Sequence, residues 1–469
     1  MNIIHISAEC YPVAKVGGLA DVVGALPKYL AQQHNNVAVV VPKYETKFTN
    51  SHSFETVFSG KVYLGNALAN FTIEKETEDV LGFQLYLINM PGVFRNQVYG
   101  YHDDTERFML FQKAFLYWLT HQNIVPDVIH CHDHHTALIP FMIQFCDVFF
   151  ALKQTPTVLT IHNGQYQGWF GFDKLYYFPK FDLAKAHFLE WGNSINPLAA
   201  GIKCAWRVTT VSPEYLNEIT YNANGLENLV SFERKKSIGI LNGIDSDVWN
   251  TETDTYINQH YSLKNFKQGK QKNKKEVCNI FNFNSDKPLF IFIGRLVYEK
   301  SADLLPQFCV EILTELSQDI NILILGSGDP HIENALENIK QYFKGSYDYY
   351  KGYNEPLAHK MYAAADFLFM PSRVEPCGLN QMYALRYGTI PIVRKTGGLK
   401  DTIQDIGDSG VGICHDQASV WDMKYSVYRA LELYKNKKLF NEVRTRAMQR
   451  NHSWNSVAQK YIEVYKSLR

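Results

Sequence analysis

Residues 2–42 are NIIHISAECYPVAKVGGLADVVGALPKYLAQQHNNVAVVVP, and their pattern predicts a β-α-β unit. The apolar run NIIHIS (2–7) predicts a strand. A glycine loop follows it, and the residues from about Leu19 to Gln33 have helical spacing. The run VAVVVP (37–42) predicts the next strand. Strands that are apolar on both faces are typical of buried parallel sheets, so the chain begins as a doubly wound α/β protein.

Further apolar runs predict strands along the rest of the chain. In the first half they lie at 83–90, 127–132, 157–162 and 207–212, with helical stretches between several of them. After a polar, lysine-rich stretch the alternation restarts. Strands are then expected at 288–295, 321–329, 366–372 and 389–393. The second half therefore predicts another Rossmann-like unit.

These patterns divide the chain into three parts. We expect an N-terminal Rossmann-like domain over residues 1–245, a C-terminal Rossmann-like domain over 246–453, and a terminal helix over 454–469. The polar segment KQGKQKNKKE (267–276) predicts a solvated helix or linker, because no aromatic residues are interleaved with its lysines as in a nucleic-acid patch. One face of the terminal helix is apolar, so we expect it to pack back on the body. The residues on that face are Val457, Tyr461, Val464 and Leu468.

The composition excludes several kinds of partner. Lys plus Arg and Asp plus Glu number 47 each, so no global charge favours nucleic acid or a membrane surface. None of the eight cysteines forms a CxxC motif, and most lie in apolar stretches, which indicates reduced, buried thiols. The sequence shows neither a signal-peptide pattern nor an apolar run of 18 residues. We expect a soluble, cytoplasmic protein that binds neither nucleic acid nor membrane.

A glycine motif occurs twice. KVGGLADVV (15–23) and KTGGLKDTI (395–403) share the pattern K-x-G-G-L-x-D. Each glycine pair lies where a loop leads into a predicted helix, whose first N–H groups can bind an anion. Two glycines before a helix are also an ordinary turn, so the repeat gains weight only from the residues at other strand ends.

Charged residues follow two of the predicted strands in the second half. GRLVYEK (294–300) places Arg295 and Lys300 after a strand, where a guanidinium fork and a point charge suit a diphosphate. An ion pair with a carboxylate and a surface lysine is the alternative. SRVEPCGL (372–379) places Glu375 on a turn before a helix, either to accept sugar hydroxyls or to support the start of the helix.

Two patterns invite a metal, and neither has convincing spacing. The first pattern is HCHDHH (130–135), which ends a predicted strand and contains Asp133. A further strand-end motif, TIHNGQYQG (160–168), contains His162. The histidine run lacks a Cys pair, and alternate residues of a strand point to opposite faces. The DxD at 245–247 stands alone, and the two cations described above already offer neutralisation of phosphates. We expect no metal and no cofactor.

Taken in order, these motifs resemble one family. KVGGLADVV, HCHDHH, TIHN, LNGID, GRLVYEK, SRVEPCGL, YGTIP and KTGGL follow one another as in the bacterial glycogen synthases and plant starch synthases. The resemblance extends from Ile4 to the terminal helix. It implies the α/β GT-B architecture, in which two Rossmann-like doubly wound domains face each other across a deep cleft. It also implies metal-independent, retaining transfer of glucose from ADP-glucose to the non-reducing end of an α-1,4-glucan.

The resemblance assigns a role to each matching residue. At the reaction centre it implies Glu375, His162, Asp133, Lys300 and Arg295. For donor binding it implies Lys15, Gly17, Gly18, Asp21, Asn242, Tyr353, Cys377, Gly378, Leu379, Thr396, Gly397 and Gly398. Both glycine motifs then serve one diphosphate, the second through backbone N–H groups, while Tyr353 stacks on the base and Tyr99 meets the acceptor glucan.

Some alternatives stay open. A stacking tyrosine accepts adenine or uracil, so UDP-glucose is a second possible donor. Other interpretations are a different retaining GT-B transferase and a catalytically silent glucan-binding homologue, although the latter predicts loss of charged residues that this chain retains. A phosphorylase would need a lysine for pyridoxal phosphate, and no motif indicates one. The chain departs from the family pattern at NPLAAG (196–201), where Pro197 and Ala199 stand in a stretch expected to carry a lysine.

Overall fold

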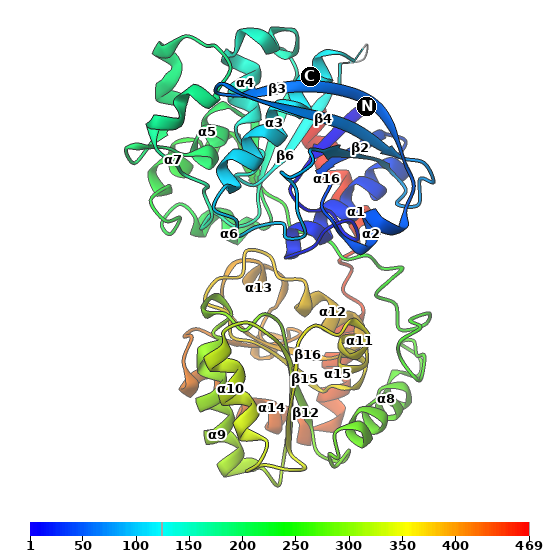
Figure 1. Ribbon diagram of the computed structural model, residues 1–469. Coiled ribbons are helices and arrows are strands. Elements are labelled where there is room, and N and C mark those ends of the chain that lie inside the picture. The colour runs from blue at the N-terminus through cyan, green and yellow to red at the C-terminus, as the bar shows by residue number, and fades with distance from the viewer. Residues whose placement is uncertain (123–124, 469) are drawn as a thin grey trace. The chain divides into compact units, whose positions relative to one another are not determined.

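The protein, seen in a computed structural model, is described over residues 1–122 and 125–468. It divides into two compact units (Figure 1). Unit 1 comprises Met1–Gly243 and Trp454–Arg469, and unit 2 comprises Ile244–Ser453. No helix in the described part of the chain combines the length and the apolar character that crossing a membrane requires.

Unit 1 is built on a nine-stranded sheet with the order β11-β10-β7-β6-β1-β2-β5-β4-β3. Its strands are β1 (Asn2–Ile6), β2 (Asn36–Pro42), β3 (Phe54–Leu64), β4 (Ala67–Glu76), β5 (Gln84–Asn89), β6 (Val128–His132), β7 (Thr157–Ile161), β10 (Arg207–Thr210) and β11 (Ser237–Gly239). β8 (Glu190–Trp191) and β9 (Ser194–Ile195) form a separate pair. The strand predictions for this part of the chain are confirmed. The antiparallel edge strand β3 was not predicted, because Val62 is its one fully buried residue and its apolar residues form no continuous run.

The helices of unit 1 surround this sheet. They are α1 (Gly18–Gln32), α2 (Lys47–Ser51), α3 (Asp104–Thr120), α4 (Ile139–Phe145), α5 (Pro197–Cys204), α6 (Pro213–Glu218), α7 (Glu227–Phe232) and α16 (Trp454–Lys466). The terminal helix α16 lies beside α1 (Figure 1). All four residues of its predicted apolar face are buried, and they share a core with Leu19, Val22 and Val23 of α1.

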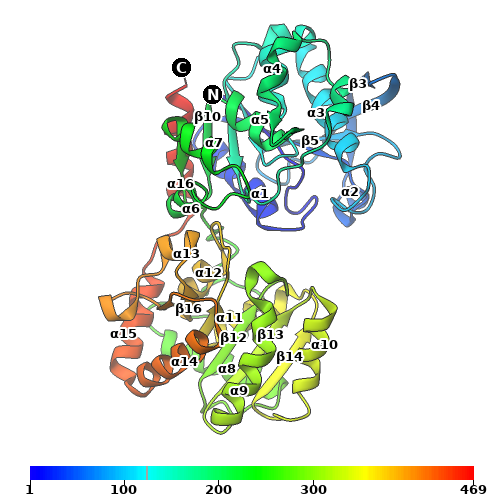
Figure 2. The same ribbon diagram turned by 90° about the vertical axis from the view of Figure 1, so that its left-hand side faces the viewer.

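Unit 2 has a six-stranded parallel sheet with the order β14-β13-β12-β15-β16-β17. The strands are β12 (Leu289–Ile293), β13 (Asn321–Gly326), β14 (Tyr347–Lys351), β15 (Phe367–Met370), β16 (Ile390–Arg394) and β17 (Ile413–His415). Figure 2 shows β12, β13 and β14 side by side. The helices are α8 (Phe266–Ile280), α9 (Leu305–Leu316), α10 (Pro330–Ile339), α11 (Glu355–Ala364), α12 (Asn380–Tyr387), α13 (Gly397–Thr402), α14 (Val420–Lys435) and α15 (Lys437–Met448). The strand order reverses between β12 and β15, which is where open α/β sheets bind ligands.

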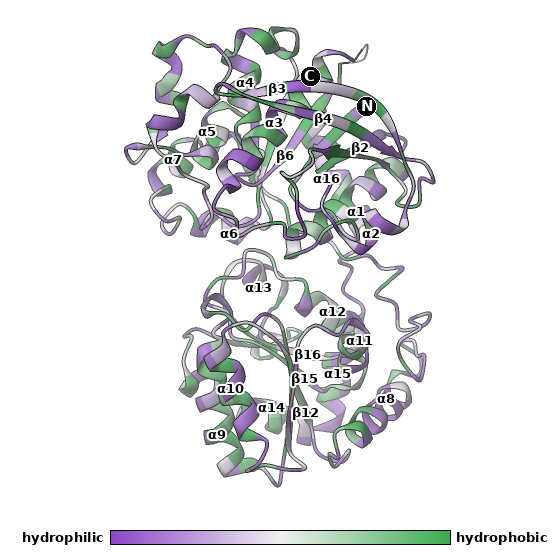
Figure 3. Ribbon diagram, viewed as in Figure 1, coloured by the Kyte–Doolittle hydropathy of each residue, from purple (hydrophilic) through white to green (hydrophobic). Residues whose placement is uncertain are grey.

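The lysine-rich segment differs from its prediction. It forms α8, which is drawn largely in purple in Figure 3, yet Lys270 and Lys274 are buried. The Lys270 ammonium donates hydrogen bonds of 3.0–3.1 Å to three carbonyls and one hydroxyl. Two of these carbonyls close α11 and one closes α12, where the helix dipoles favour a cation. The prediction of a solvated segment is therefore wrong for these two lysines.

A buried ion triad connects three elements of unit 2. Asp366, just before β15, lies 2.5 Å from the Arg444 guanidinium of α15 and 2.8 Å from the Lys274 ammonium of α8. Its carboxylate also accepts the N–H of Leu289 at 2.9 Å. Burial alone would raise the pKa of Asp366, but the two cations lower that pKa to about 2. The triad contributes stability above pH ~4 that is lost as the pH falls toward 2.

We expect Asp366→Asn to lower the unfolding free energy of unit 2 by about 3–5 kcal/mol, because two buried cations lose their shared anion. Urea unfolding followed by tryptophan fluorescence measures this, with the exposed Asp319→Asn as the matched control. Equal unfolding midpoints for Asp366→Asn and the control would contradict the structural role of the triad.

Candidate active site

Three loops of unit 2 meet at the carboxyl edge of its sheet. They span residues 294–304, 371–379 and 395–398 and follow the neighbouring strands β12, β15 and β16. The first two loops are hydrogen-bonded through the backbone, since the N–H groups of Arg373 and Val374 donate to the carbonyl of Glu299 at 2.8 and 3.2 Å. These loops contain half of the residues that the resemblance assigns to donor binding, together with Arg295, Lys300 and Glu375.

Lys300 and Glu375 form the central contact of this edge. The Lys300 ammonium lies 2.6 Å from both carboxylate oxygens, and the Ser372 hydroxyl donates to one of them at 2.9 Å. The Lys300 side chain is 24% exposed and that of Glu375 only 7%. A nearly buried carboxylate is thus held in one orientation beside a cation that solvent can still reach.

The second glycine motif supports the Glu375 loop directly. A Cβ atom on Gly397 would lie 2.1 Å from the carbonyl oxygen of Glu375, and one on Gly398 would lie 2.0 Å from that of Cys377. The N–H of Gly398 donates to the carbonyls of Glu375 and Pro376 at 3.1 and 3.2 Å. The resemblance assigns this N–H to the diphosphate, but here it is hydrogen-bonded to backbone carbonyls of the neighbouring loop. The two glycines are required because backbone packs against backbone here.

Of the other predicted residues of unit 2, Arg295 and Tyr353 are exposed, whereas Thr396 is buried. The Arg295 side chain is 50% exposed, and its distance to the Glu299 carboxylate is 3.8 Å. Gly378 has a φ of +71°, which favours glycine, and with Leu379 it leads into α12, whose first N–H groups lack intrahelical acceptors. Tyr353 follows β14 and is 74% exposed, with its hydroxyl 3.2 Å from the Glu355 carboxylate. Thr396 is buried at the start of α13.

In unit 1 the first glycine motif is held by a residue that the sequence did not single out. One carboxylate oxygen of Glu9 accepts the N–H groups of Val16 and Gly17 at 2.5 and 3.0 Å. Its other oxygen accepts the Tyr99 hydroxyl at 2.7 Å. Burial raises the pKa of Glu9. Tyr99, expected at the acceptor, is thus also part of the support for the KVGGL loop.

The glycines of this first motif have open space around them. A Cβ atom on Gly17 or Gly18 would meet no atom within 4 Å in the described structure. Lys15 is exposed and forms an ion pair of 2.6 Å with Asp21, in the first turn of α1. The loop therefore leaves room for a ligand above the N-terminus of α1, which favours anions.

Asp133 and His162 lie together at the ends of β6 and β7. Asp133 has a φ of +55°, and its carboxylate accepts the N–H of His162 at 2.7 Å. Burial raises the pKa of Asp133 to about 7, although backbone N–H groups oppose the shift. His162 directs Nε2 inward to Nδ1 of His132 at 3.0 Å. Burial lowers the pKa of His162 to about 3.

Asn242 and the NPLAAG stretch complete the predicted set in unit 1. The side-chain oxygen of Asn242 is buried without a hydrogen-bond partner among the described residues, a state that a ligand hydroxyl would relieve. In NPLAAG, Ala199 is fully buried in α5, and its N–H donates to the Asn196 side chain at 3.0 Å. The departure from the family pattern therefore lies in a packed helix start.

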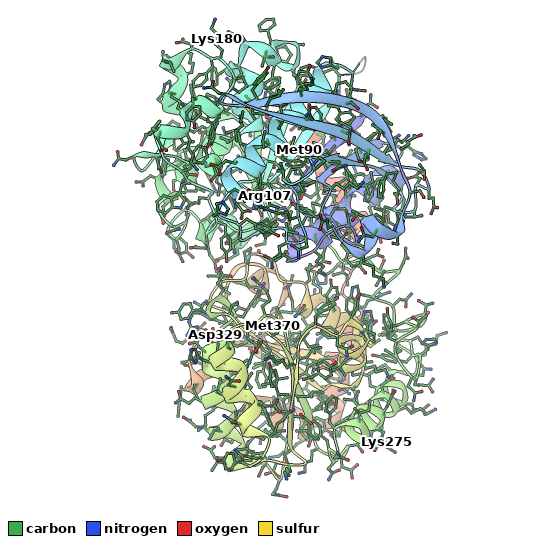
Figure 4. The ribbon with its side chains drawn as sticks, viewed as in Figure 1. Met90, Arg107, Lys180, Lys275, Asp329 and Met370 are labelled. Carbon is green, nitrogen blue, oxygen red and sulfur yellow. The ribbon has the colours of Figure 1, made fainter. Side chains whose placement is uncertain are left out.

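Arg107 of α3, labelled in Figure 4, is a further residue that the sequence analysis missed. Its buried guanidinium donates to the carbonyls of Val93, Gln97 and Val98 at 2.9–3.3 Å, in the loop that leads to Tyr99. An arginine in the first turn of α3, just before the apolar run that follows it, was the available signal, as was the acidic Glu9 between β1 and the glycine motif. Neither signal indicates a partner from sequence alone.

Comparison with known proteins identifies the family. Residues 2–232 match the starch synthase catalytic domain, and residues 259–446 match the group 1 glycosyl transferases. The glycogen synthase of Flavobacterium johnsoniae is 59% identical over 466 residues, which cover 99% of this chain and 98% of that protein. The chain belongs to the glycogen synthase family. It is therefore a glycosyltransferase, as the motifs predicted.

More distant relatives agree with this assignment. The glycogen synthase of Streptococcus pneumoniae is 37% identical over the full length of both chains. The catalytic domain of starch synthase IV from Arabidopsis thaliana, solved with ADP and acarbose bound, has a TM-score of 0.91 and 33% identity, covering 100% of this chain and 99% of that one. A sucrose-phosphate synthase from Thermosynechococcus elongatus shares the fold, with a TM-score of 0.64, 16% identity and coverage of 99% and 98%. The predicted GT-B fold is confirmed.

We expect Glu9→Gln to raise the KM for the nucleotide sugar by ~10-fold with kcat nearly unchanged, because a charge-assisted hydrogen bond to the loop is worth about 1.5–3 kcal/mol. Steady-state kinetics of glycosyl transfer measures this. Glu45→Gln, an exposed change, is the matched control. A KM equal to that of the control would show that Glu9 does not organise the donor loop.

The activity should depend on the protonation of Asp133. Because its pKa is raised to about 7, Asp133 gains a proton and loses its charge as the pH falls through that value. We expect kcat/KM to fall below pH ~7, since a carboxylate accepts hydroxyl hydrogen bonds better than a carboxylic acid does. Asp133→Asn should give low activity without this limb, whereas the exposed Asp147→Asn should keep it. A wild-type profile that is flat between about pH 6 and about pH 8 would refute this role.

Proposed function

We propose that the protein transfers glucose from ADP-glucose to the non-reducing end of an α-1,4-glucan with retention of the α configuration. The observation that carries this proposal is the Lys300–Glu375 pair at the switch point of the unit 2 sheet, where the exposed Arg295 lies on the same loop as Lys300. A cation pair beside a fixed carboxylate suits a sugar diphosphate. The ADP and acarbose bound to the related starch synthase IV support a nucleotide donor and a glucan acceptor.

The cations have their main role at the leaving group. When the bond between the anomeric carbon and the diphosphate oxygen breaks, its electron pair stays on the diphosphate. Arg295 and Lys300 stabilise this charge. The N–H groups at the start of α12, near Gly378 and Leu379, add partial positive charge. Tyr353 stacks on the base.

The remaining residues hold the sugar. Asp133, His162 and Asn242 bind its hydroxyls, and Glu375 stabilises the positive charge that develops on the ring. The acceptor hydroxyl attacks from the face that the diphosphate leaves, and its proton passes to the departing phosphate oxygen. In this proposal Glu375 forms no covalent bond to the sugar; Lys300 and Ser372 hold its carboxylate in one orientation, from which it acts by its charge.

We further propose that the transfer needs no metal ion and takes place in the cytoplasm. The carboxylate of Asp245, in the DxD sequence, accepts the backbone N–H groups of Asp247 and Val248 at 3.0 and 3.4 Å, so it is engaged in a local turn. All eight cysteines are free and buried, which suits a reducing compartment. Activity that survives extensive chelation would support metal independence.

The decisive experiment measures nucleoside diphosphate release on a glycogen primer, with ADP-glucose and UDP-glucose supplied separately. We expect primer-dependent release that is faster with ADP-glucose. Arg295→Ala should lower kcat/KM by about 100–1,000-fold, the usual effect of removing one group that stabilises transition-state charge. Its melting temperature should stay the same because the side chain is half exposed. The exposed Arg450→Ala is the matched control.

Three results would contradict parts of this proposal. Absence of release with either sugar would favour the catalytically silent homologue or another acceptor. Faster release with UDP-glucose would reverse the donor assignment. A glucosyl adduct on Glu375, detected by mass spectrometry of enzyme quenched during turnover, would replace front-face attack by double displacement.

A further inference from the structure

Three buried histidines form a continuous hydrogen-bonded chain in unit 1. His5 lies on β1, His132 ends β6, and His162 follows β7, and these strands are neighbours in the sheet. Nδ1 of His5 lies 3.0 Å from Nε2 of His132, and Nδ1 of His132 lies 3.0 Å from Nε2 of His162. His5 and His132 are fully buried. The chain thus runs from the core of the sheet to the predicted sugar site.

The far end of this chain has no partner. Nε2 of His5 is buried without a hydrogen bond in the part of the chain that the structure describes. Burial also lowers the pKa of His5 and of His162 to about 3 each, and that of His132 well below its ordinary value. All three rings are therefore neutral near pH 7, and each has one N–H donor and one acceptor nitrogen.

These constraints leave two possible arrangements of protons. Since each neutral ring donates once and accepts once, both hydrogen bonds must point the same way along the chain. If they point toward His5, its Nε2 carries a buried N–H with no acceptor. If both hydrogen bonds point toward His162, Nε2 of His5 carries only a lone pair. Orphaned buried N–H groups are the rarer defect in proteins, so the second direction is favoured.

We propose that His5 and His132 are positioning residues that hold His162 as its Nδ1–H tautomer, so that its ring donates a hydrogen bond to an oxygen of the bound nucleotide sugar. The role toward the sugar rests on the proposed function. His162 uses Nε2 inside the core, so Nδ1 is the ring nitrogen left to meet a ligand. The backbone of His162 is fixed as well, because its N–H donates to Asp133.

The tautomer of His162 decides which atoms of the nucleotide sugar this side chain can bind. A sugar hydroxyl can accept or donate a hydrogen bond, but phosphate oxygens and the sugar ring oxygen carry no proton and can only accept one. A ring with Nδ1–H binds them, whereas the opposite tautomer would repel them with a lone pair. The hydrogen bond at one imidazole nitrogen sets the proton on the other, which makes His132 the residue through which the core controls the site.

A fourth histidine provides an internal comparison. His130 stacks on His132 with ring centroids 4.4 Å apart, but it bonds instead to the Thr160 hydroxyl at 2.6 Å and the Tyr465 hydroxyl at 2.7 Å. His5, His130 and His132 also lie close enough together to be considered as metal ligands. The hydrogen bond between His5 and His132 uses one ring nitrogen of each residue. We therefore assign these two rings to the hydrogen-bonded row of histidines and not to a metal site.

The test is nitrogen NMR of the full-length protein labelled with 15N-histidine, without substrate. Long-range proton–nitrogen correlations distinguish the two tautomers of each ring, and the His162 signals are assigned from a His162→Gln sample. We expect His162 to appear as Nδ1–H. His132→Leu should mix its tautomers and lower kcat/KM by ~10–100-fold, the usual effect of removing a group that orients a site residue. His132→Gln, whose amide can donate and accept, should restore most of the activity.

Tyr465→Phe is the matched control, because it removes a hydrogen bond to His130, which stacks on His132 but is not part of the hydrogen-bonded row of His5, His132 and His162. Stability can change in this variant, but the His162 tautomer and kcat should not. An Nε2–H signal for His162 in the wild type would overturn the proposal. So would a stoichiometric metal ion in the purified protein that is lost in His5→Leu, or an unchanged tautomer and kcat in His132→Leu. The NMR result is independent of glucosyl transfer, so its failure differs from failure of the proposed function.

Discussion

The ion pair between Lys300 and Glu375 is the contact on which the site in unit 2 depends. It joins the loop after β12 to the loop after β15 in surroundings that are largely buried, where opposite charges attract more strongly than in water. The Ser301 hydroxyl donates to the carbonyl of Pro371 at 2.8 Å and reinforces the same junction. The third loop closes the arrangement through Gly397 and Gly398. The functional residues are thus positioned by each other before any ligand arrives.

The two glycine motifs show how one sequence pattern can meet two physical demands. At Gly17 and Gly18 an added side chain would enter open space, so packing alone does not require glycine there. At Gly397 and Gly398 it would collide with backbone carbonyl oxygens. The first pair keeps a surface clear, and the second lets two loops touch. Similarity of sequence therefore did not imply similarity of role.

The fold was predictable because each central strand is a continuous apolar run, and this signal survives without tertiary context. The candidate residues at strand ends could be proposed for the same reason, since the apolar runs show where each strand ends. Partners were not predictable. Nothing within α8 shows that Lys270 meets carbonyls from α11 and α12, and nothing near Glu9 shows that it meets Val16 and Tyr99. Those contacts depend on where distant segments arrive in space.

The position of α16 has a consequence for how the chain is made. Unit 1 is discontinuous, with its last helix encoded after the whole of unit 2. Trp454, Tyr461 and Tyr465 fill part of the core against α1, and the Tyr465 hydroxyl is hydrogen-bonded to His130 of β6. During synthesis, unit 2 can complete its core while unit 1 still lacks the helix α16, which covers part of its own core. The core of unit 1 can therefore be complete only after α16 has been synthesised, which is later than all of unit 2.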